Sequence, residues 1–217
     1  MAILIGMVSQ KGGVGKSTMS RLVAREYAAA GWDVKIADLD ISQGTSTDWK
    51  QRREQNALQP DVAVEPFRTV EQALKVASLY HLLIFDGPPH SMAGTLEIAR
   101  VSDVVVLPTG LSLDDLKPTI LLAHELTGAG IAAGKLTFAL CRVGDRENEI
   151  TEARAYIRKA GYPVLAGELP ERTGYRRASD EGRALSETSH PSLRTRAEKL
   201  AQSIIDLVSE RQQQKVA

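Results

Sequence analysis

Residues 9–18, with the sequence SQKGGVGKST, constrain the fold more than any other stretch of the chain. They lie between an apolar run at residues 3–8 and a run at residues 16–30 whose apolar residues recur at helical spacing. A glycine-rich turn between a strand and a helix lets backbone N–H groups surround phosphate oxygens at the positive end of the helix dipole. The stretch therefore predicts a strand, a phosphate-binding loop and a helix, in that order.

The end of this loop fits the phosphate-binding pattern G-x-x-x-x-G-K-[ST], with Gly15, Lys16 and Ser17 at the last three positions. Lys16 is placed to bind the β- and γ-phosphates of a nucleotide, and the Ser17 hydroxyl to bind Mg²⁺. The first glycine of the pattern is replaced by Gln10, and Lys11 is a second lysine where the pattern requires none. The loop is thus a phosphate site with an additional positive charge.

Short apolar runs alternate with helical patterns along the rest of the chain. Strands are expected near residues 3–8, 33–40, 62–67, 81–89, 103–109, 138–143 and 162–170, and helices near residues 16–30, 71–79, 114–126, 147–160 and 192–211. This alternation is typical of a parallel sheet covered on both faces. We therefore predict one α/β domain at residues 1–211, with a P-loop fold, a mostly parallel twisted sheet and helices on both faces. Residues 212–217 are expected to form a flexible tail.

The composition favours a cytoplasmic protein without a cysteine-based site. The chain has 217 residues, of which 43% are hydrophobic, and this is enough for one well-buried domain. The 27 basic residues are balanced by 27 acidic ones, which excludes a strongly basic surface as a global property. The single cysteine, Cys141, excludes an intrachain disulfide framework and a multi-cysteine metal site. The sequence shows neither a membrane span nor the basic segment of a signal peptide.

Aspartates end two of the expected strands. Asp86 ends the apolar run LLIFD, where a carboxylate holds the Mg²⁺ shell of a P-loop site, usually through water. Asp38 and Asp40 end the second strand, which should place them at the same edge of a parallel sheet. We expect Asp38 to contribute to the magnesium site and Asp40 to orient a water molecule for attack on the γ-phosphate.

These motifs resemble those of the ParA/MinD family of deviant Walker A P-loop ATPases. KGGVGKST resembles the deviant Walker A motif, DLD resembles switch I, and IFDGPP resembles Walker B with switch II. The stretch LPERTGYRRASDEGRAL resembles the segment where the chain of these proteins passes the adenine. The resemblance covers nearly the whole chain. The short length is most similar to the small plasmid-partition ParA proteins, which work with a separate centromere-binding protein.

The resemblance implies a homodimer that forms on ATP binding, with ATP and Mg²⁺ as cofactors. Lys11 would reach across the dimer to the phosphates of the other subunit and offset the repulsion between two facing ATP molecules. The expected catalytic residues are Lys11, Lys16 and Asp40, and the expected magnesium residues are Ser17, Asp38 and Asp86. The expected nucleotide-binding residues are Gly12, Gly13, Val14, Gly15, Lys16, Ser17, Thr18 and, on the adenine side, Arg142, Pro170 and Glu171. For the three adenine-side residues, ordinary loop chemistry explains the pattern equally well.

The switch I run departs from the D-x-D-P-Q pattern of the family's plasmid members. Residues 38–43 read DLDISQ, which is one residue longer and lacks the proline. The extra residue places switch I differently, so that the water-orienting role falls to Asp40 or to Asp38.

Arginines near the C-terminus are candidate DNA contacts, because partition ATPases of this kind hold nonspecific DNA through its phosphates. Residues 171–199 carry seven positive and five negative side chains, a net excess of +2, and a solvated mixed face explains this pattern equally well. We nominate Arg172, Arg176 and Arg177 as DNA-binding residues. The helix at residues 192–211 lacks the basic polar face of a membrane-surface helix, so no membrane partner is expected.

The leading hypothesis is an ATP-dependent DNA-partition ATPase that associates with the nucleoid. It would dimerise on ATP, bind nonspecific DNA and hydrolyse ATP slowly under the control of a ParB-like or ParG-like centromere-binding protein. One alternative is a family member that positions another cargo or aids conjugation. The other is a metabolic ATP-dependent ligase, as in biotin or cobalamin synthesis, although no segment clearly supplies a dedicated substrate pocket.

Overall fold

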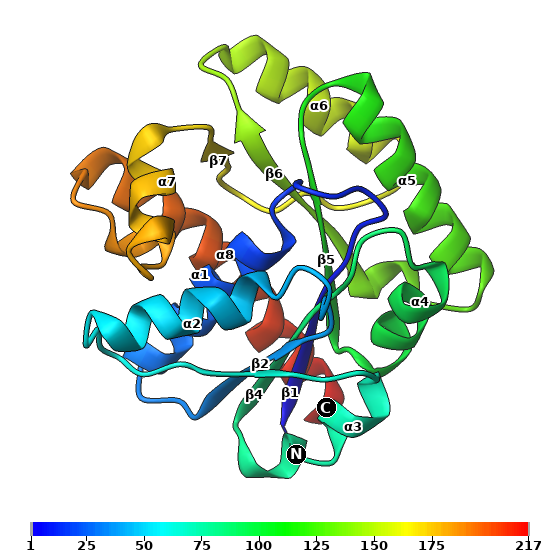
Figure 1. Cartoon of the computed structure of the whole chain (residues 1–217). Coiled ribbons are helices and arrows are strands. Elements are labelled where there is room, and N and C mark those ends of the chain that lie inside the picture. Colours follow the sequence, from blue (N-terminus) through cyan, green and yellow to red (C-terminus); the bar gives the residue numbers. More distant parts are fainter. Residues whose placement is uncertain (1, 217) are drawn as a thin grey trace.

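The computed structural model describes residues 2–216, with side chains up to residue 213, and consists of one sheet between two layers of helices (Figure 1). The strands are β1 (Ile3–Met7), β2 (Val34–Asp38), β3 (Ala63–Pro66), β4 (Leu82–Asp86), β5 (Val104–Thr109), β6 (Leu136–Val143) and β7 (Leu169–Pro170). The α-helices are α1 (Lys16–Ala29), α2 (Thr45–Gln55), α3 (Val70–Leu74), α4 (Met92–Val101), α5 (Leu113–Gly128), α6 (Glu147–Lys159), α7 (Thr173–Asp180) and α8 (Pro191–Val216).

The seven strands form one sheet in the order β3-β2-β4-β1-β5-β6-β7, and every strand pair is parallel. This confirms the predicted α/β fold class with its parallel sheet. Because the strands run in one direction, β1, β2 and β4 all end at the same edge, and the phosphate loop and both aspartate-tipped strands meet there. The register pairs Met7 and Asp38 with Asp86 across the three strands.

Two hydrophobic clusters cover the two faces of the sheet. One cluster joins β1 residues such as Ile5 to apolar side chains of α1, α2, α7 and α8, among them Met19 and Trp49. The other joins β4 residues such as Phe85 to side chains of α3, α4, α5 and α6. Figure 1 shows these two groups of helices on opposite sides of the sheet. The buried faces fix the strand ends on which the site is built.

Several elements differ from the sequence-based expectation. The patterns did not predict α2, α4 or α7, and the helix expected at residues 71–79 is divided into α3 and a short 3₁₀ helix at Ala77–Leu79. The strand expected at residues 162–170 is reduced to β7 and an isolated bridge between Phe138 and Val164. Arg154 explains the reduction, because it binds the carbonyl oxygens of Leu165 and Gly167, each at 2.7 Å, and holds this stretch out of the sheet. Gly167 also adopts a φ of 81°, which an extended strand does not accommodate.

The α8 helix continues into the segment expected to be a flexible tail. The structure describes it as helical from Pro191 to Val216, whereas the sequence patterns placed the end of the helix at residue 211. Ala217 lies outside the described residues.

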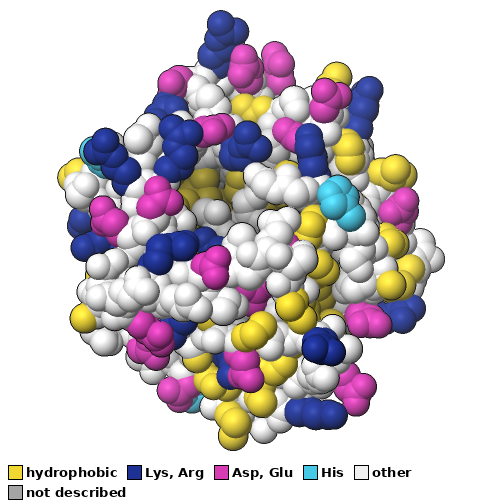
Figure 2. Space-filling view, viewed as in Figure 1, with side chains coloured by type: hydrophobic (Ala, Val, Ile, Leu, Met, Phe, Trp, Pro, Cys, Tyr) yellow, Lys and Arg dark blue, Asp and Glu magenta, His cyan; other side chains and the backbone are white. Residues whose placement is uncertain are grey.

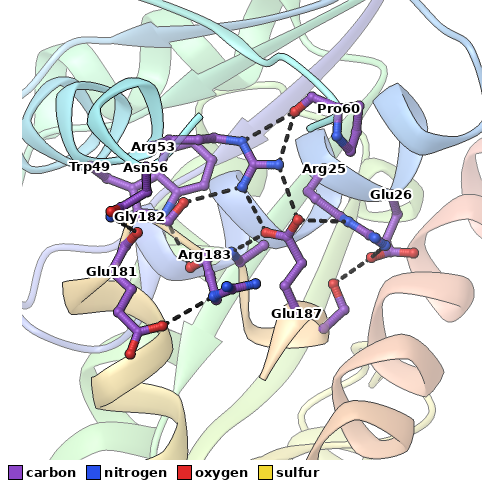
Figure 3. Close-up of polar contacts among 12 residues, drawn as sticks. Arg25, Glu26, Trp49, Arg53, Asn56, Pro60, Glu181, Gly182, Arg183 and Glu187 are labelled. Carbon is purple, nitrogen blue, oxygen red and sulfur yellow. Dashed lines mark hydrogen bonds and ion pairs between the residues drawn. The ribbon is translucent and has the colours of Figure 1, made fainter. Parts of the chain in front are cut away.

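A buried ion pair ties α2 to the segment at residues 181–187, and we call this arrangement the α2 clamp (Figure 3). Arg53 is 1% exposed, and its guanidinium binds both carboxylate oxygens of Glu187, at 2.7 and 3.0 Å. It also donates to the carbonyl oxygens of Gly182, at 3.1 Å, and Pro60, at 2.8 Å. Gly182 must be a glycine, because a Cβ atom there would lie 2.3 Å from the Arg53 amide nitrogen. The clamp therefore fixes the C-terminal half of α2 against the segment that follows α7.

Candidate nucleotide-binding site

The phosphate loop leads directly into the N-terminus of α1. Gly15 precedes the helix with a φ of 112°, a left-handed conformation that favours glycine, and a Cβ atom there would lie 3.3 Å from the Cys141 sulfur. Around Gly12 and Gly13, by contrast, the space is open. The free N–H groups at the start of a 14-residue helix therefore face a region that an anion can enter.

A cavity of about 460 Å³ lies over this loop, and most of the predicted nucleotide-binding residues line it. Its lining includes Gly12, Gly13, Gly15, Lys16, Ser17, Thr18, Asp40, Arg142, Pro170 and Glu171. Val14 instead lines a smaller cavity of about 220 Å³ beside Asp115. Figure 2 shows the larger hollow with basic side chains on its rim and apolar side chains inside it. The structure thus brings together the loop and the segments predicted to contact the base.

Lys16 is buried, but its ammonium group has little hydrogen bonding within the described residues. Its side chain is enclosed with the residue 7% exposed, and its Nζ atom lies 3.4 Å from the carbonyl oxygen of Lys11. Burial lowers its pKa, and the nearby carboxylates of Asp86 and Asp40 act in the opposite direction. A buried ammonium with one long hydrogen bond has donors left for an anionic ligand.

Asp86 has the geometry of a carboxylate that serves a cation. It is fully buried, and its Oδ2 atom accepts a 2.6 Å hydrogen bond from the Ser46 hydroxyl. Its Oδ1 atom has no hydrogen-bond partner among the described residues. Burial raises its pKa to about 6, against the influence of the Ser46 hydrogen bond, the charge of Arg21 and the nearby Ser17 hydroxyl, which lies beyond hydrogen-bond geometry from Oδ1. A buried carboxylate oxygen without a partner fits a water molecule of a Mg²⁺ shell, and the Ser17 hydroxyl on the cavity wall fits a direct ligand.

The two switch I aspartates face different surroundings. Asp40 lines the cavity, and its Oδ1 atom accepts a 2.8 Å hydrogen bond from the Ser42 hydroxyl. Asp38 is fully buried and accepts hydrogen bonds from the backbone amide of Asp40, at 3.2 Å, and from the amide and hydroxyl of Thr47, at 3.1 and 3.0 Å. The carboxylate of Asp38 therefore joins switch I to α2, whereas that of Asp40 borders the space where a nucleotide would lie.

Lys11 is held by the N-terminal turn of α5. Its ammonium forms an ion pair with Asp115 and lies 3.5 Å from the carbonyl oxygen of Asp114. Burial alone would raise the pKa of Asp115, but hydrogen bonds from Lys11 and Ser112 outweigh it and lower the pKa. The Lys11 side chain is 47% exposed and contributes nothing to the lining of the large cavity.

The arginines nominated for DNA binding lie at the rim of the same cavity. Arg172 and Arg176 line it, Arg172 pairs with Asp145, and Arg176 lies 3.9 Å from Glu171. Arg177 is exposed and lies outside the lining. Two of the three nominated side chains are therefore paired with carboxylates of their own chain.

Arg142 occupies a strained position between the loop and the expected adenine side. Its φ of 56° is left-handed, at an irregularity in the pairing of β6 with β7. Its guanidinium lies 3.4 Å from the Gly13 carbonyl oxygen and 3.5 Å from the Glu171 carboxylate. Arg142 thus connects the phosphate loop to the segment of Pro170 and Glu171.

Several residues at the site were missed from the sequence. Arg21, Gln43, Thr45, Tyr175 and Ser179 line the cavity, Ser46 binds Asp86, and Asp115 binds Lys11. The sequence offers no signal for Arg21, because helical spacing places it opposite Met19 and Val23, away from the apolar face of the first predicted helix.

Comparison with known proteins identifies the family of the chain. A sequence profile of the CobQ/CobB/MinD/ParA nucleotide-binding domain matches residues 5–185. The chain belongs to this family. The family and the loop geometry together make the chain a P-loop ATPase related to plasmid-partition and cell-division proteins, with ATP and Mg²⁺ as its cofactors.

Solved structures share this fold at low sequence identity. The cell division ATPase MinD of Pyrococcus furiosus is 20% identical with a TM-score of 0.74, and the match covers 95% of this chain and 100% of that one. MinD of Pyrococcus horikoshii in complex with Mg-ADP is 19% identical with a TM-score of 0.74, and the match covers 97% and 99%. A putative plasmid partition protein of Borrelia burgdorferi bound to AMPPNP is 16% identical with a TM-score of 0.73, and the match covers 95% and 99%.

No curated protein is significantly similar in sequence to the chain. Within residues 2–216, none of the helices combines the length and the apolar character needed to cross a membrane.

Proposed function

We propose that the chain is a DNA-partition ATPase that dimerises when it binds ATP. The observation that carries this proposal is the position of Lys11, an exposed lysine of the phosphate loop that lies outside the cavity of its own subunit. A lysine in that position can serve the phosphates of a second copy of the chain. The fold shared with the Borrelia partition protein supports partition as the process.

The residues of the cavity suit ATP hydrolysis. Lys16 binds the phosphates, and the Ser17 hydroxyl with the unpartnered oxygen of Asp86 would hold Mg²⁺. The cation supplies charge neutralisation for the phosphate oxygens and orients them. Asp40 borders the cavity and orients the attacking water, while Asp38 supports α2 and is assigned no magnesium contact.

Exposed apolar side chains next to Asp40 and near Asp115, the partner of Lys11, are candidates for a dimer interface. Ile41, next to Asp40, is 52% exposed, and Leu113, two residues before Asp115, is 53% exposed. Single exposed apolar side chains are common on protein surfaces, so these two residues only add to the argument from Lys11. Dimerisation through this face would bring the Lys11 of each copy toward the phosphates held by the other.

The dimer would hold nonspecific DNA and respond to a centromere-binding protein of the ParB-like or ParG-like kind, and so associate with the nucleoid. Arg177 is the nominated arginine that is exposed and outside the cavity lining, so it is the first candidate for a phosphate contact. Arg172 and Arg176 would have to exchange their carboxylate partners for DNA phosphates. Binding of this type is insensitive to base sequence and falls steeply with salt.

The deciding experiment measures the mass of the protein in solution with ATP, ADP or no nucleotide, with and without plasmid DNA at low and moderate salt. The wild type should dimerise with ATP alone and bind DNA only as that dimer. Lys11→Ala should bind ATP as a monomer and lose both dimerisation and hydrolysis. Lys75→Ala, at an exposed lysine of the loop after α3, is the matched control and should behave like the wild type.

Three outcomes would contradict the proposal. An ATP-bound Lys11→Ala protein that dimerises like the wild type removes the role of Lys11 across the interface. If the wild-type dimer does not bind DNA even at low salt, the partition role is contradicted and the positioning of another cargo is favoured. ATP hydrolysis that is stimulated by a small metabolite and not by DNA would favour a metabolic ligase.

A further inference from the structure

Arg21 of α1 is a buried cation in the wall of the nucleotide cavity. The residue is 7% exposed, although arginine is rarely buried without a carboxylate partner. Its Nε atom donates to the Ser46 hydroxyl at 3.2 Å and its Nη1 atom to the Ser179 hydroxyl at 3.4 Å. Both of these partners are neutral hydroxyls, and Arg21 forms no ion pair within the described residues. The geometry around the guanidinium therefore calls for an explanation beyond packing.

Ser46 connects Arg21 to the carboxylate of Asp86. Ser46 is fully buried at the start of α2, and its hydroxyl donates to the Asp86 Oδ2 atom at 2.6 Å. The directions of these bonds are fixed, because a guanidinium only donates and an ionised carboxylate only accepts. The single Ser46 proton thus points to Asp86, and its oxygen accepts from Arg21. Hydrogen bonds in such a chain polarise and strengthen one another.

The two hydrogen bonds that link Arg21, Ser46 and Asp86 occupy one oxygen of Asp86 and leave the other available. Oδ2 is held by Ser46, and Oδ1 has no partner among the described residues. Burial lowers the pKa of Arg21 to about 10, so the guanidinium stays charged at neutral pH. The guanidinium also lies 5.8 Å from the centroid of the Trp49 ring, which restricts where it can move.

We propose that Arg21 is a positioning residue for the magnesium site, acting on Asp86 through Ser46. The hydrogen bonds from Arg21 through Ser46 set the rotamer of Asp86 so that its Oδ1 atom faces the cation. The bond to Ser179 extends the same link to α7, the helix that carries Arg176 and Arg177. The inference rests on the proposed magnesium role of Asp86 and is independent of DNA partition.

The test measures ATP affinity by calorimetry, first with EDTA and then over a Mg²⁺ series, in the wild type, Arg21→Met and Ser46→Ala. Affinity without Mg²⁺ measures the direct effect of each substitution on nucleotide binding, because Arg21 lines the cavity, and the Mg²⁺ dependence is compared relative to that value. Mg²⁺ increases the affinity for ATP, and the Mg²⁺ concentration that gives half of this increase should be about 10-fold higher in both variants than in the wild type. A change of this size is typical when a group that supports a metal ligand is removed. Arg21→Lys should need less Mg²⁺ than Arg21→Met, because an ammonium also donates to Ser46.

The double variant with both Arg21→Met and Ser46→Ala adds a second readout. Because the two residues act through one chain, the double variant should need no more Mg²⁺ than the worse single variant. If the increases in Mg²⁺ requirement of the two single variants add up in the double variant, Arg21 does not act through Ser46. If melting curves show that Arg21→Met does not fold, the Ser46→Ala result decides.

The controls separate this inference from the proposed site itself. Arg25→Met lies one turn further along α1 and removes pairs with Glu26 and Glu187, so it should leave the Mg²⁺ dependence unchanged. Ser102→Ala removes another buried hydroxyl, which binds the Ile98 carbonyl oxygen, and should also leave it unchanged. If Asp86→Asn has no effect on the Mg²⁺ dependence, the proposed site fails. If Asp86→Asn shifts it while Arg21→Met and Ser46→Ala do not, the role of Arg21 fails alone.

Discussion

The nucleotide cavity and the α2 clamp are both polar, and both join segments far apart in the sequence, but they satisfy their polar groups to different degrees. In the clamp, Arg53 contacts two carbonyl oxygens and both oxygens of Glu187. At the cavity, an oxygen of Asp86 has no partner within residues 2–216, and Lys16 reaches one carbonyl oxygen at 3.4 Å. The polar groups of the clamp bind one another and stabilise the fold, whereas those of the cavity are available for a ligand.

Replacement of Lys16 by alanine should have the largest effect on binding. Loss of the buried ammonium removes a charged contact to the phosphates, which costs on the order of 4 kcal/mol, or about 1000-fold in ATP affinity. Stability should not fall, because the ammonium makes only one long hydrogen bond among the described residues, to the Lys11 carbonyl oxygen. Calorimetric titration with ATP and a melting curve measure the two effects.

Lys50→Ala provides the matched control for this prediction. Lys50 pairs with Asp61 and Glu54 on the outer side of α2, and its loss should leave ATP affinity unchanged. Unchanged affinity in Lys16→Ala would contradict the phosphate assignment. A marked loss of stability in Lys16→Ala would contradict the contrast between cavity and clamp.

Replacement of Glu187 by glutamine should have the largest effect on stability. It leaves the Arg53 guanidinium buried without its counter-charge, and breaking a buried pair in this way costs about 3–5 kcal/mol. Urea unfolding measures the loss. ATP affinity at low temperature should stay within a few-fold of the wild type, because the clamp lies outside the phosphate loop.

The control for Glu187→Gln is Glu149→Gln, which breaks the exposed pair with Arg146. An exposed pair of this kind contributes less than about 1 kcal/mol. If Glu187→Gln and Glu149→Gln lose similar stability, the clamp is no stronger than a surface ion pair, and the comparison between the two regions fails.

The sequence predicted the cavity better than the clamp, for physical reasons. Phosphate binding depends on a contiguous loop, so Gly15, Lys16 and Ser17 are recognisable as a pattern, and the apolar runs gave the strands that position them. The clamp depends on α2, whose buried residues are Ser46, Trp49 and Arg53. They have helical spacing, but two of the three are polar, so the helix lacks an apolar stripe.

Long-range partners were the other part that sequence patterns missed. Arg53 and Glu187 are 134 residues apart, and Lys11 and Asp115 are 104 residues apart. No local rule pairs such residues, because the pairing is set by the order of strands in the sheet. The separate positions of Asp38 and Asp40 also became visible only with α2 in place, since Thr47 binds Asp38.

Replacement of Asp40 by alanine should slow ATP hydrolysis and leave ATP bound. A residue that orients the attacking water contributes about 100-fold in rate, so the ATP-bound dimer should accumulate. Single-turnover hydrolysis and solution mass with ATP measure the two effects. Normal turnover in Asp40→Ala would move the role to another residue, for which Asp38→Asn is the next variant. Because Asp38 supports α2, this second variant should also lower stability.

Acid should weaken the clamp, and this is the smallest of the expected effects. Burial alone would raise the pKa of Glu187, but hydrogen bonds from Arg53 and the Ala184 amide outweigh it and lower the pKa below its usual value. A carboxylate whose pKa is lower in the folded state stabilises the protein fully above its unfolded pKa of about 4.3, and this contribution is lost as the pH falls through the folded pKa. The stability difference between the wild type and Glu187→Gln should therefore be constant from pH 7 to about pH 5.5 and shrink below about pH 4.5. Urea unfolding of both proteins across this range measures it. A difference that already shrinks between pH 7 and about pH 6 would show that a histidine or another group controls the clamp, and a difference that persists to about pH 3 would show that the charge of Glu187 contributes little.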